Sequence, residues 1–368
     1  MKKFLVLGIG NAQVDLLLYL RTLETFEVHA LSNSPNGRGF QFADIFETID
    51  ITNKDAVLNY AEKEKIDYIY SVGSDAAMPT VAYVAEKLGI NTFTSYNTAY
   101  TCNNKNLFRE KLSDCYGSVP HVVVHQEKEL TVASQLTFPV IVKPVDSQGQ
   151  RGVGTANSIE GVHALYKEAK SHSRSGKVII EEKIIGEEIS VNVYLLNGEI
   201  VFFLPSGRIS WEQFDGGIIH KHYLPSQLSS AAEGNVLKLV KDSLAKLEID
   251  NGPAYFQIKM DSDIPYLIEV TPRFDGCHMW RLIKNSCGID LLEIAVQHLT
   301  DGQCQNVNKA RKIIPFCLEF HCMPPNESFT TPEVDPNAVY DEMYYEEGEC
   351  VRKMNGKMEK CGYKVYPL

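Results

Sequence analysis

The stretch Phe138–Gly154, FPVIVKPVDSQGQRGVG, joins a short apolar run to a glycine-rich segment. Residues 139–142 predict a buried strand with Lys143 at its end. The glycines allow the following loop to bend, because glycine adopts backbone angles that other residues resist. Exposed N–H groups in such a loop can wrap a phosphate, and a lysine on the adjoining strand adds a positive charge. From this stretch alone, a β-hairpin tip with a surface lysine remains the alternative interpretation.

The composition is that of a folded protein large enough for two or three domains. The 368 residues are 44% hydrophobic and 23% charged, which is ordinary for a globular chain. The formal net charge of -11 argues against a nucleic-acid-coating role, because phosphate backbones are held by clustered Lys and Arg. No window approaches the roughly 18 apolar residues of a membrane-spanning helix, and the N-terminal FLVLGIG is too short for a signal peptide. Nine cysteines without CxxC pairs indicate reduced thiols, so we expect a cytoplasmic protein.

The N-terminal part alternates between strand and helix patterns. Strands are expected at 3–7, 27–31 and 68–72, with helices at 12–23 and 54–64. This alternation predicts a parallel sheet covered by helices.

Two loops of this part follow predicted strands at the end where open α/β sheets bind ligands. The first, Gly8-Ile9-Gly10, lacks the third glycine of the dinucleotide fingerprint, and the second strand ends in His29-Ala30-Leu31 rather than an acidic residue. Nicotinamide binding is therefore disfavoured. The second, Gly73-Ser74-Asp75, could bind a ligand or cap a helix through Ser74 or Asp75.

The rest of the chain predicts a second α/β region rich in antiparallel strands. Helices are expected at 98–113, 127–136, 158–171, 228–247 and 289–299, and strands at 121–124, 178–182, 189–196, 200–204, 252–260, 264–270, 314–322 and 338–345. Asn197-Gly198 is the clearest turn signal, because this pair favours a two-residue hairpin.

Three segments with chemistry-bearing residues follow one another along this region. The first contains Lys105, Lys143 and the glycine loop, the second is IIEEKIIGEEIS at 179–190, and the third pairs Gln257 with LIEVTPR at 267–273. Their order and spacing resemble the ATP-grasp superfamily over about residues 98–305, and the preceding residues resemble the pre-ATP-grasp domain.

The resemblance implies a mixed α/β and α+β fold. A Rossmann-like pre-ATP-grasp domain is expected over residues 1–97, followed by a two-lobed ATP-grasp domain over 98–305. The small lobe would cover about 115–187 and the large lobe about 188–305. A small β-rich appendage is expected over 306–368.

The resemblance also implies an ATP site. Lys105 and Lys143 would neutralise the triphosphate while the glycine loop closes over it as a lid. Glu181 would receive the exocyclic amine of adenine, and Glu188 would hold the ribose hydroxyls. The further ATP-binding residues implied are Ser147, Gln148, Gly149 and Gly152 in the loop, and Glu182, Lys183 and Ile184 beside the adenine ring edge. Without the resemblance, the 181–188 segment would be interpreted as an acidic, solvated strand end.

A magnesium site is implied on the facing strands, because Mg²⁺ (or Mn²⁺) takes oxygen ligands and bridges phosphates. Glu269 is the strongest candidate ligand, since an unpaired buried glutamate is costly. Gln257 stands where many members carry an acid, although carbamoyl phosphate synthetase also uses glutamine. Thr271 replaces the usual asparagine, so the number of metal ions stays open.

Catalytic and substrate residues complete the expected site. By resemblance, Arg273 would steady the transferred phosphoryl group, with Lys143 as its catalytic partner; a surface salt bridge is the alternative for Arg273. Arg281 suits a substrate carboxylate, and Asp275 and His278 are further substrate candidates. A satisfied core histidine is the alternative for His278.

The predicted function is an ATP-dependent carboxylate–amine ligase that forms an amide through an acyl phosphate and releases ADP and phosphate. Its partners would be a small-molecule carboxylate and an amine, whose identities the sequence leaves open. Carboxyl phosphate or carbamoyl phosphate chemistry, or an ATP-binding regulatory protein with impaired catalysis, are the alternatives. The C-terminal segment could cover the site or form a homodimer contact.

Overall fold

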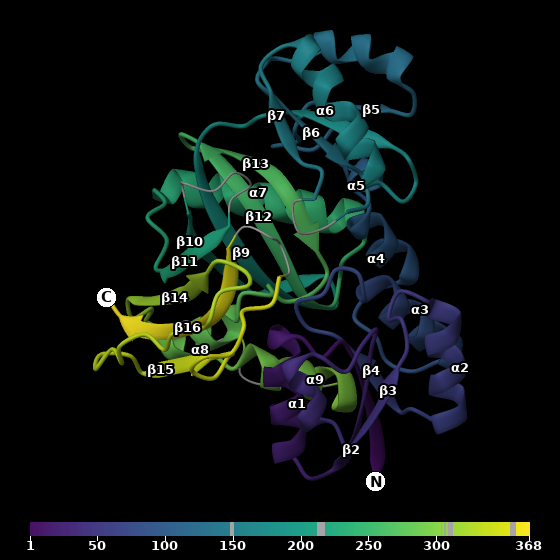
Figure 1. Cartoon of the computed structure of the whole chain (residues 1–368), viewed down its shortest axis with the longest axis vertical. Coiled ribbons are helices and arrows are strands. Elements are labelled where there is room, and N and C mark those ends of the chain that lie inside the picture. Colours follow the sequence, from purple (N-terminus) through teal and green to yellow (C-terminus); the bar gives the residue numbers. More distant parts are fainter. Residues whose placement is uncertain (148–150, 212–217, 303, 305–306, 308–311, 354–357) are drawn as a thin grey trace.

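The computed structural model describes residues 1–147, 151–211, 218–302, 304, 307, 312–353 and 358–368. These residues form two four-stranded sheets and one eight-stranded sheet, with helices packed against them. Figure 1 shows the N-terminal sheet at one end of the molecule, the sheet of residues 121–182 at the opposite end, and the large sheet between them. The mixed α/β and α+β fold expected from the sequence is confirmed.

The N-terminal sheet is parallel, as the alternation predicted. Its order is β3-β2-β1-β4, and β1 is buried from Phe4 to Leu7 because the chain there is continuously apolar. The elements are β1 (Lys2–Leu7), α1 (Asn11–Thr22), β2 (Phe26–Ser32), a 3₁₀ turn (Arg38–Phe42), β3 (Ile45–Thr48), α2 (Lys54–Glu64), β4 (Tyr68–Tyr70) and α3 (Met78–Leu88). Strand β3 was not predicted.

The helix predicted at 98–113 is broken at Asn104. Helix α4 (Tyr96–Asn103) ends there and α5 (Lys105–Lys111) begins, because Asn104 is extended, with φ -119° and ψ 108°. The Asn104 side chain donates to the Tyr100 carbonyl. The break places Lys105 in the first turn of α5, where its backbone N–H donates to the carbonyl of Val145.

The second sheet is antiparallel in the order β5-β8-β6-β7. It consists of β5 (His121–Val124), β6 (Val140–Pro144), β7 (Gly154–Ala156) and β8 (Val178–Glu182), with a 3₁₀ helix (Glu127–Gln135) and α6 (Ile159–Ser171). Ser158 caps α6 by accepting from the Gly161 N–H, and Val162 and Tyr166 pack into the core with Val140, Val142 and Ile180. The opening stretch therefore contains the buried strand that its apolar run predicts.

The large sheet has the order β13-β12-β9-β10-β11-β14-β16-β15. Its strands are β9 (Glu187–Leu196), β10 (Glu199–Ser210), β11 (Ile219–Leu224), β12 (Gly252–Asp261), β13 (Ile264–Thr271), β14 (Phe316–Met323), β15 (Tyr340–Met343) and β16 (Glu359–Pro367). Asn197 and Gly198 both have positive φ, 51° and 82°, as a type I′ turn between β9 and β10 requires.

The two faces of this sheet differ because side chains alternate along each strand. Residues 189, 191, 193 and 195 of β9 are apolar and share a core with α7 (Ser230–Leu247). The intervening residues Glu188, Ser190 and Asn192 are polar. Helix α7 thus covers one face, and the opposite face of β9 and its neighbours carries the candidate site.

The C-terminal residues are β-rich, as expected, and continue the large sheet. Strands β14, β15 and β16 extend the large sheet beyond β11, as Figure 1 shows for the yellow strands. Helix α9 (Leu291–Asp301) was predicted, whereas α8 (Met279–Cys287) was not. Both helices share one hydrophobic core with the N-terminal sheet and the C-terminal strands.

Candidate active site

A buried ionic cluster lies where the small sheet meets α5. Lys143, on β6, donates to Glu181, on β8, at 2.6 Å. Arg109, on α5, donates to both oxygens of the same carboxylate at 2.9 and 3.3 Å. The Arg109 guanidinium also donates to the carbonyls of Leu267 and Ile268 on β13. One carboxylate therefore joins two cations and links the small sheet to the large one.

The charges of this cluster depend on one another. Burial alone would raise the pKa of Glu181, but the positive charges of Arg109 and Lys143 hold it below its usual range. Burial lowers the pKa of Lys143, and the negative charge of Glu181 opposes that effect. Arg109 was missed by the sequence analysis; the available signal was its position one helical turn after Lys105.

The glycine loop begins beside Lys105. The Lys105 ammonium donates to the carbonyl of Ser147 at 2.9 Å. Gly152 has φ 70°, so a residue with a side chain would be strained there. Gln148 and Gly149 lie outside the described residues. The structure thus brings Lys105 and Ser147 together.

The strand end expected to hold adenine has its backbone donors partly occupied. The Glu182 N–H donates to the Pro120 carbonyl, and the Lys183 N–H to the Pro139 carbonyl. The Lys183 ammonium lies 3.4 Å from the Thr155 hydroxyl. A contact between the backbone of Glu182 and a base edge can therefore involve only its carbonyl, whereas the expectation for Ile184 stays a prediction.

Glu188 is held by its neighbours on the polar face. Its carboxylate lies 2.6 Å from Nε of the buried Arg208 on β10, and Gln257 donates its side-chain amide to the same carboxylate at 2.6 Å. Because the amide nitrogen of Gln257 is used in this way, the side-chain oxygen remains available as a ligand.

Three oxygen-bearing side chains, Gln257, Glu269 and Thr271, lie on adjacent strands. Gln257 is directly opposite Glu269 in the β12–β13 pairing, so their side chains point to the same side. The Thr271 hydroxyl is buried and has no hydrogen-bond partner among the described residues. An all-oxygen donor set with one carboxylate suits a hard cation such as Mg²⁺, so these residues fit the metal that the sequence predicted.

Arg273 follows this group and is buried rather than on the surface. Its guanidinium donates to Asp75 of the N-terminal region at 2.8 and 2.5 Å and to the Phe274 carbonyl at 2.7 Å. Helix α3 has no side-chain cap, so Asp75 does not cap it. Instead, the Gly73-Ser74-Asp75 loop meets the large sheet through this ion pair.

A cavity of 560 Å³ adjoins the same loop. It is lined by Gly73, Ser74 and residues 11–13 of the N-terminal region, by Arg151 of the glycine loop, by Gly276 and His278, and by the C-terminal residues Phe320, Tyr344, Glu359 and Lys360. The cavity therefore lies between the N-terminal region, the glycine loop and the large sheet, whose C-terminal strands form part of its wall.

The substrate candidates occupy different environments. His278 interacts with Asp15 at 2.9 Å and with the Tyr344 hydroxyl at 2.8 Å. Arg281 donates to Asp15 at 2.5 Å and to the Tyr363 hydroxyl at 2.8 Å. Both side chains thus connect the α8 segment to α1 and to the C-terminal region through hydrogen bonds. The interpretation of His278 as a satisfied core histidine is favoured, and the Arg281 guanidinium is already bonded to protein groups. Asp275 is buried near His222, at 3.9 Å.

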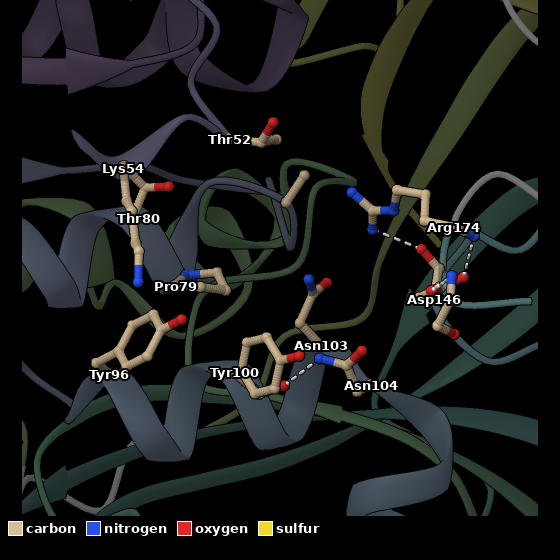
Figure 2. A pocket seen from close by; sticks show the side chains of 12 residues that line it. Thr52, Lys54, Pro79, Thr80, Tyr96, Tyr100, Asn103, Asn104, Asp146 and Arg174 are labelled. Atoms are coloured by element: carbon tan, nitrogen blue, oxygen red, sulfur yellow. Dashed lines mark hydrogen bonds between the residues drawn. The ribbon is translucent and has the colours of Figure 1, made fainter. Parts of the chain in front are cut away.

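A second cavity of 350 Å³ lies between the N-terminal region and the small sheet. Figure 2 shows Lys54 and Tyr96 on one side and Arg174 with Asp146 on the other. Arg174 donates to the Asp146 carbonyl at 2.6 Å. None of the described residues predicted to bind ATP, metal or substrate lines this cavity.

Within the described part of the chain, no helix is both long enough and apolar enough to span a membrane.

Comparison with known proteins supports the ATP-grasp resemblance. A family model described as an ATP-grasp domain matches residues 136–280. The chain is 24% identical, over 74% of its length and 68% of the relative, to formate-dependent phosphoribosylglycinamide formyltransferase of Rhodococcus jostii. It is 27% identical to the enzyme of that name from Methanocaldococcus jannaschii, over 74% of this chain and 69% of the relative.

Solved structures share the fold. Phosphoribosylglycinamide synthetase from Anaerococcus prevotii superposes with a TM-score of 0.77 at 20% identity, over 99% of this chain and 93% of that one. L-Amino acid ligase from Bacillus licheniformis gives 0.78 at 18% identity, over 100% and 93%. The matched domain contains the Lys143–Glu181 pair and the facing residues of β12 and β13. Residues 136–280 therefore form an ATP-grasp domain, and the relatives support an enzyme of the ligase class.

Proposed function

We propose that this enzyme joins a carboxylate to an amine, using ATP to form an acyl phosphate that the amine attacks, with release of ADP and phosphate. The observation that carries the proposal is the contiguous polar row Glu188, Gln257 and Glu269, in which Gln257 bonds to Glu188 and faces Glu269. Glu188, proposed to hold the ribose, therefore lies beside Gln257 and Glu269, whose side-chain oxygens suit a Mg²⁺ ion.

The protein's own groups would act mainly by position and charge. Lys105 and Lys143 would meet the phosphates, and Ser147, bonded to Lys105, would begin the loop that covers them. Arg273 would stabilise the charge on the transferred phosphoryl group; its ion pair with Asp75 holds the guanidinium in place. Mg²⁺, when bound by Gln257, Glu269 and Thr271, would neutralise phosphate charge.

The 560 Å³ cavity is proposed as the acceptor site. It adjoins the Asp75–Arg273 pair through Ser74 and the glycine loop through Arg151, so an acceptor bound there would lie between the phosphoryl-transfer residues and the C-terminal wall. The wall residues Lys360 and Glu359 carry opposite charges. Such a wall can hold a molecule that has both an acidic and a basic group.

The test is a phosphate-release screen of the whole chain with ATP, Mg²⁺, and panels of amino acids, sugar acids and small amines. We expect release that requires both an acid and an amine, with ADP as the nucleotide product. Glu269→Ala should abolish the signal, whereas Glu233→Ala on the exposed side of α7 should leave it unchanged. AMP as the product would contradict the acyl phosphate route, and turnover that depends on bicarbonate would indicate carboxyl phosphate chemistry.

A further inference from the structure

Three buried side chains with metal-binding atoms meet outside the proposed magnesium residues. They are His222 on β11, and Asp275 and Cys277 in the segment that follows β13. Their ligand atoms all lie within 4.8 Å of one another, and His222 Nε2 is 3.9 Å from Asp275 Oδ2. Ligands of one tetrahedral zinc ion are about 3.3–3.8 Å apart, given bonds of about 2.0–2.3 Å. An ion bound by all three side chains would bring their ligand atoms closer together than they are here.

The trio has unsatisfied polar atoms in the protein interior. His222 is 0% exposed, and neither of its ring nitrogens has a hydrogen-bond partner among the described residues; the same holds for Asp275 Oδ2. The other Asp275 oxygen accepts from the Cys277 N–H at 3.1 Å, which fixes the carboxylate orientation. Leaving such groups buried and unpaired is costly, and a bound ion would satisfy the imidazole and the carboxylate together.

The surrounding charges permit a cation here. Arg208 is opposite His222 in the strand pairing, but its guanidinium is neutralised by Glu188 at 2.6 Å. The Lys360 ammonium donates to the Cys277 sulfur at 3.3 Å.

We propose that His222, Asp275 and Cys277 form a binding site for a zinc-like divalent transition metal. Nitrogen, oxygen and sulfur donors together select a borderline ion such as Zn²⁺, whereas Mg²⁺ takes oxygen ligands. Three protein ligands leave a fourth position open, as in catalytic zinc sites. Gly276 and Lys360, which adjoin the trio, line the 560 Å³ cavity, so the trio lies behind the wall of that cavity. The site is independent of the proposed ligase function.

Cobalt is the probe for this site, because Co²⁺ bound to a thiolate gives a charge-transfer absorption band and tetrahedral Co²⁺ absorbs strongly in the visible region. The whole chain, treated with a chelator and then titrated with Co²⁺ without ATP, should develop both signals with a stoichiometry of one. Zn²⁺ should displace the signals, and excess Mg²⁺ should leave them unchanged.

Variants assign the ligands. Cys277→Ser should remove the charge-transfer band. His222→Ala should weaken Co²⁺ binding by at least about tenfold, because removing even a residue that only hydrogen-bonds to a metal ligand costs at least that much affinity. Cys102→Ala, a buried cysteine on α4, is the matched control and should retain the full signal. Far-ultraviolet circular dichroism checks folding, and Cys277→Ala replaces the serine variant if that variant unfolds. A wild-type chain without the band at one equivalent, or a band that persists in the Cys277 variants, overturns the proposal.

Discussion

Glu181 is the anion between two buried cations, so replacing it by glutamine should be strongly destabilising. Glu181→Gln keeps the shape but leaves Arg109 and Lys143 facing one another without a counter-charge. Removing one partner of a buried ionic group typically costs about 3–5 kcal/mol. With a urea m-value of about 3 kcal/mol/M, the unfolding midpoint should fall by about 1–1.7 M.

The measurement is urea unfolding followed by circular dichroism without nucleotide. Glu182→Gln is the matched control, because its side chain accepts from the Thr137 N–H at the surface and glutamine keeps that acceptor; we expect a loss below about 1 kcal/mol. The loss in Glu181→Gln should also shrink at alkaline pH. Burial already lowers the pKa of Lys143, and without Glu181 it falls further, so the folded variant sheds that proton at a pH where the unfolded chain still holds it.

A second substitution tests the cause directly. Adding Lys143→Met to Glu181→Gln removes one of the two unopposed cations, so part of the lost stability should return. The reasoning is refuted if Glu181→Gln costs less than about 1 kcal/mol, or if the double variant is as unstable as the sum of the two single variants.

Three further outcomes are expected from the structure. Lys143→Met should weaken ATP binding at least about tenfold, because it removes the positive charge proposed to meet the phosphates. Lys167→Met, on the exposed side of α6, should leave ATP binding unchanged. Calorimetric titration with ATP compares the two variants. Burial would raise the pKa of Asp15, but the hydrogen bonds and positive charges of its partners lower it from 3.8 to about 2. This carboxylate therefore stabilises the fold by about 2.5 kcal/mol above pH 4, and that stability is lost as the pH falls toward 2. Acid unfolding of Asp15→Asn should lack this pH-dependent loss, and a pH profile equal to that of the wild type would contradict the reasoning. An alanine Cβ at Gly207 would overlap a tyrosine ring on β11, so Gly207→Ala should lower the free energy of unfolding by about 1–3 kcal/mol. Gly234 has open space around it on α7, so Gly234→Ala should raise the free energy of unfolding by about 0.5–1 kcal/mol. Thermal unfolding measures both changes.

Local patterns predicted most of the elements. Continuous apolar runs indicated buried strands such as β1 and β6, and the Asn197-Gly198 pair located a hairpin, because these signals depend on side chains a few residues apart. Two elements differ from the prediction. Asn104 interrupts an otherwise helical pattern by adopting an extended backbone. Helix α8 begins at Met279 after His278, which has a left-handed backbone conformation and whose side chain contacts the distant residues Asp15 and Tyr344.

By itself, the sequence determined the class of the protein and the order of its motifs along the chain. The order and spacing of the segments that contain Lys143, Glu181, Gln257 and Glu269 resemble the ATP-grasp superfamily, and that resemblance predicted ATP binding before any coordinates. Partnerships across the fold were decided only by tertiary structure.

The pairs Arg109–Glu181, Asp75–Arg273 and His222–Asp275 join residues 72, 198 and 53 positions apart. No periodicity links such positions, because their proximity comes from strand order and from packing between sheets rather than from helix or strand geometry. The same packing places the β-rich C-terminal strands in the wall of the cavity.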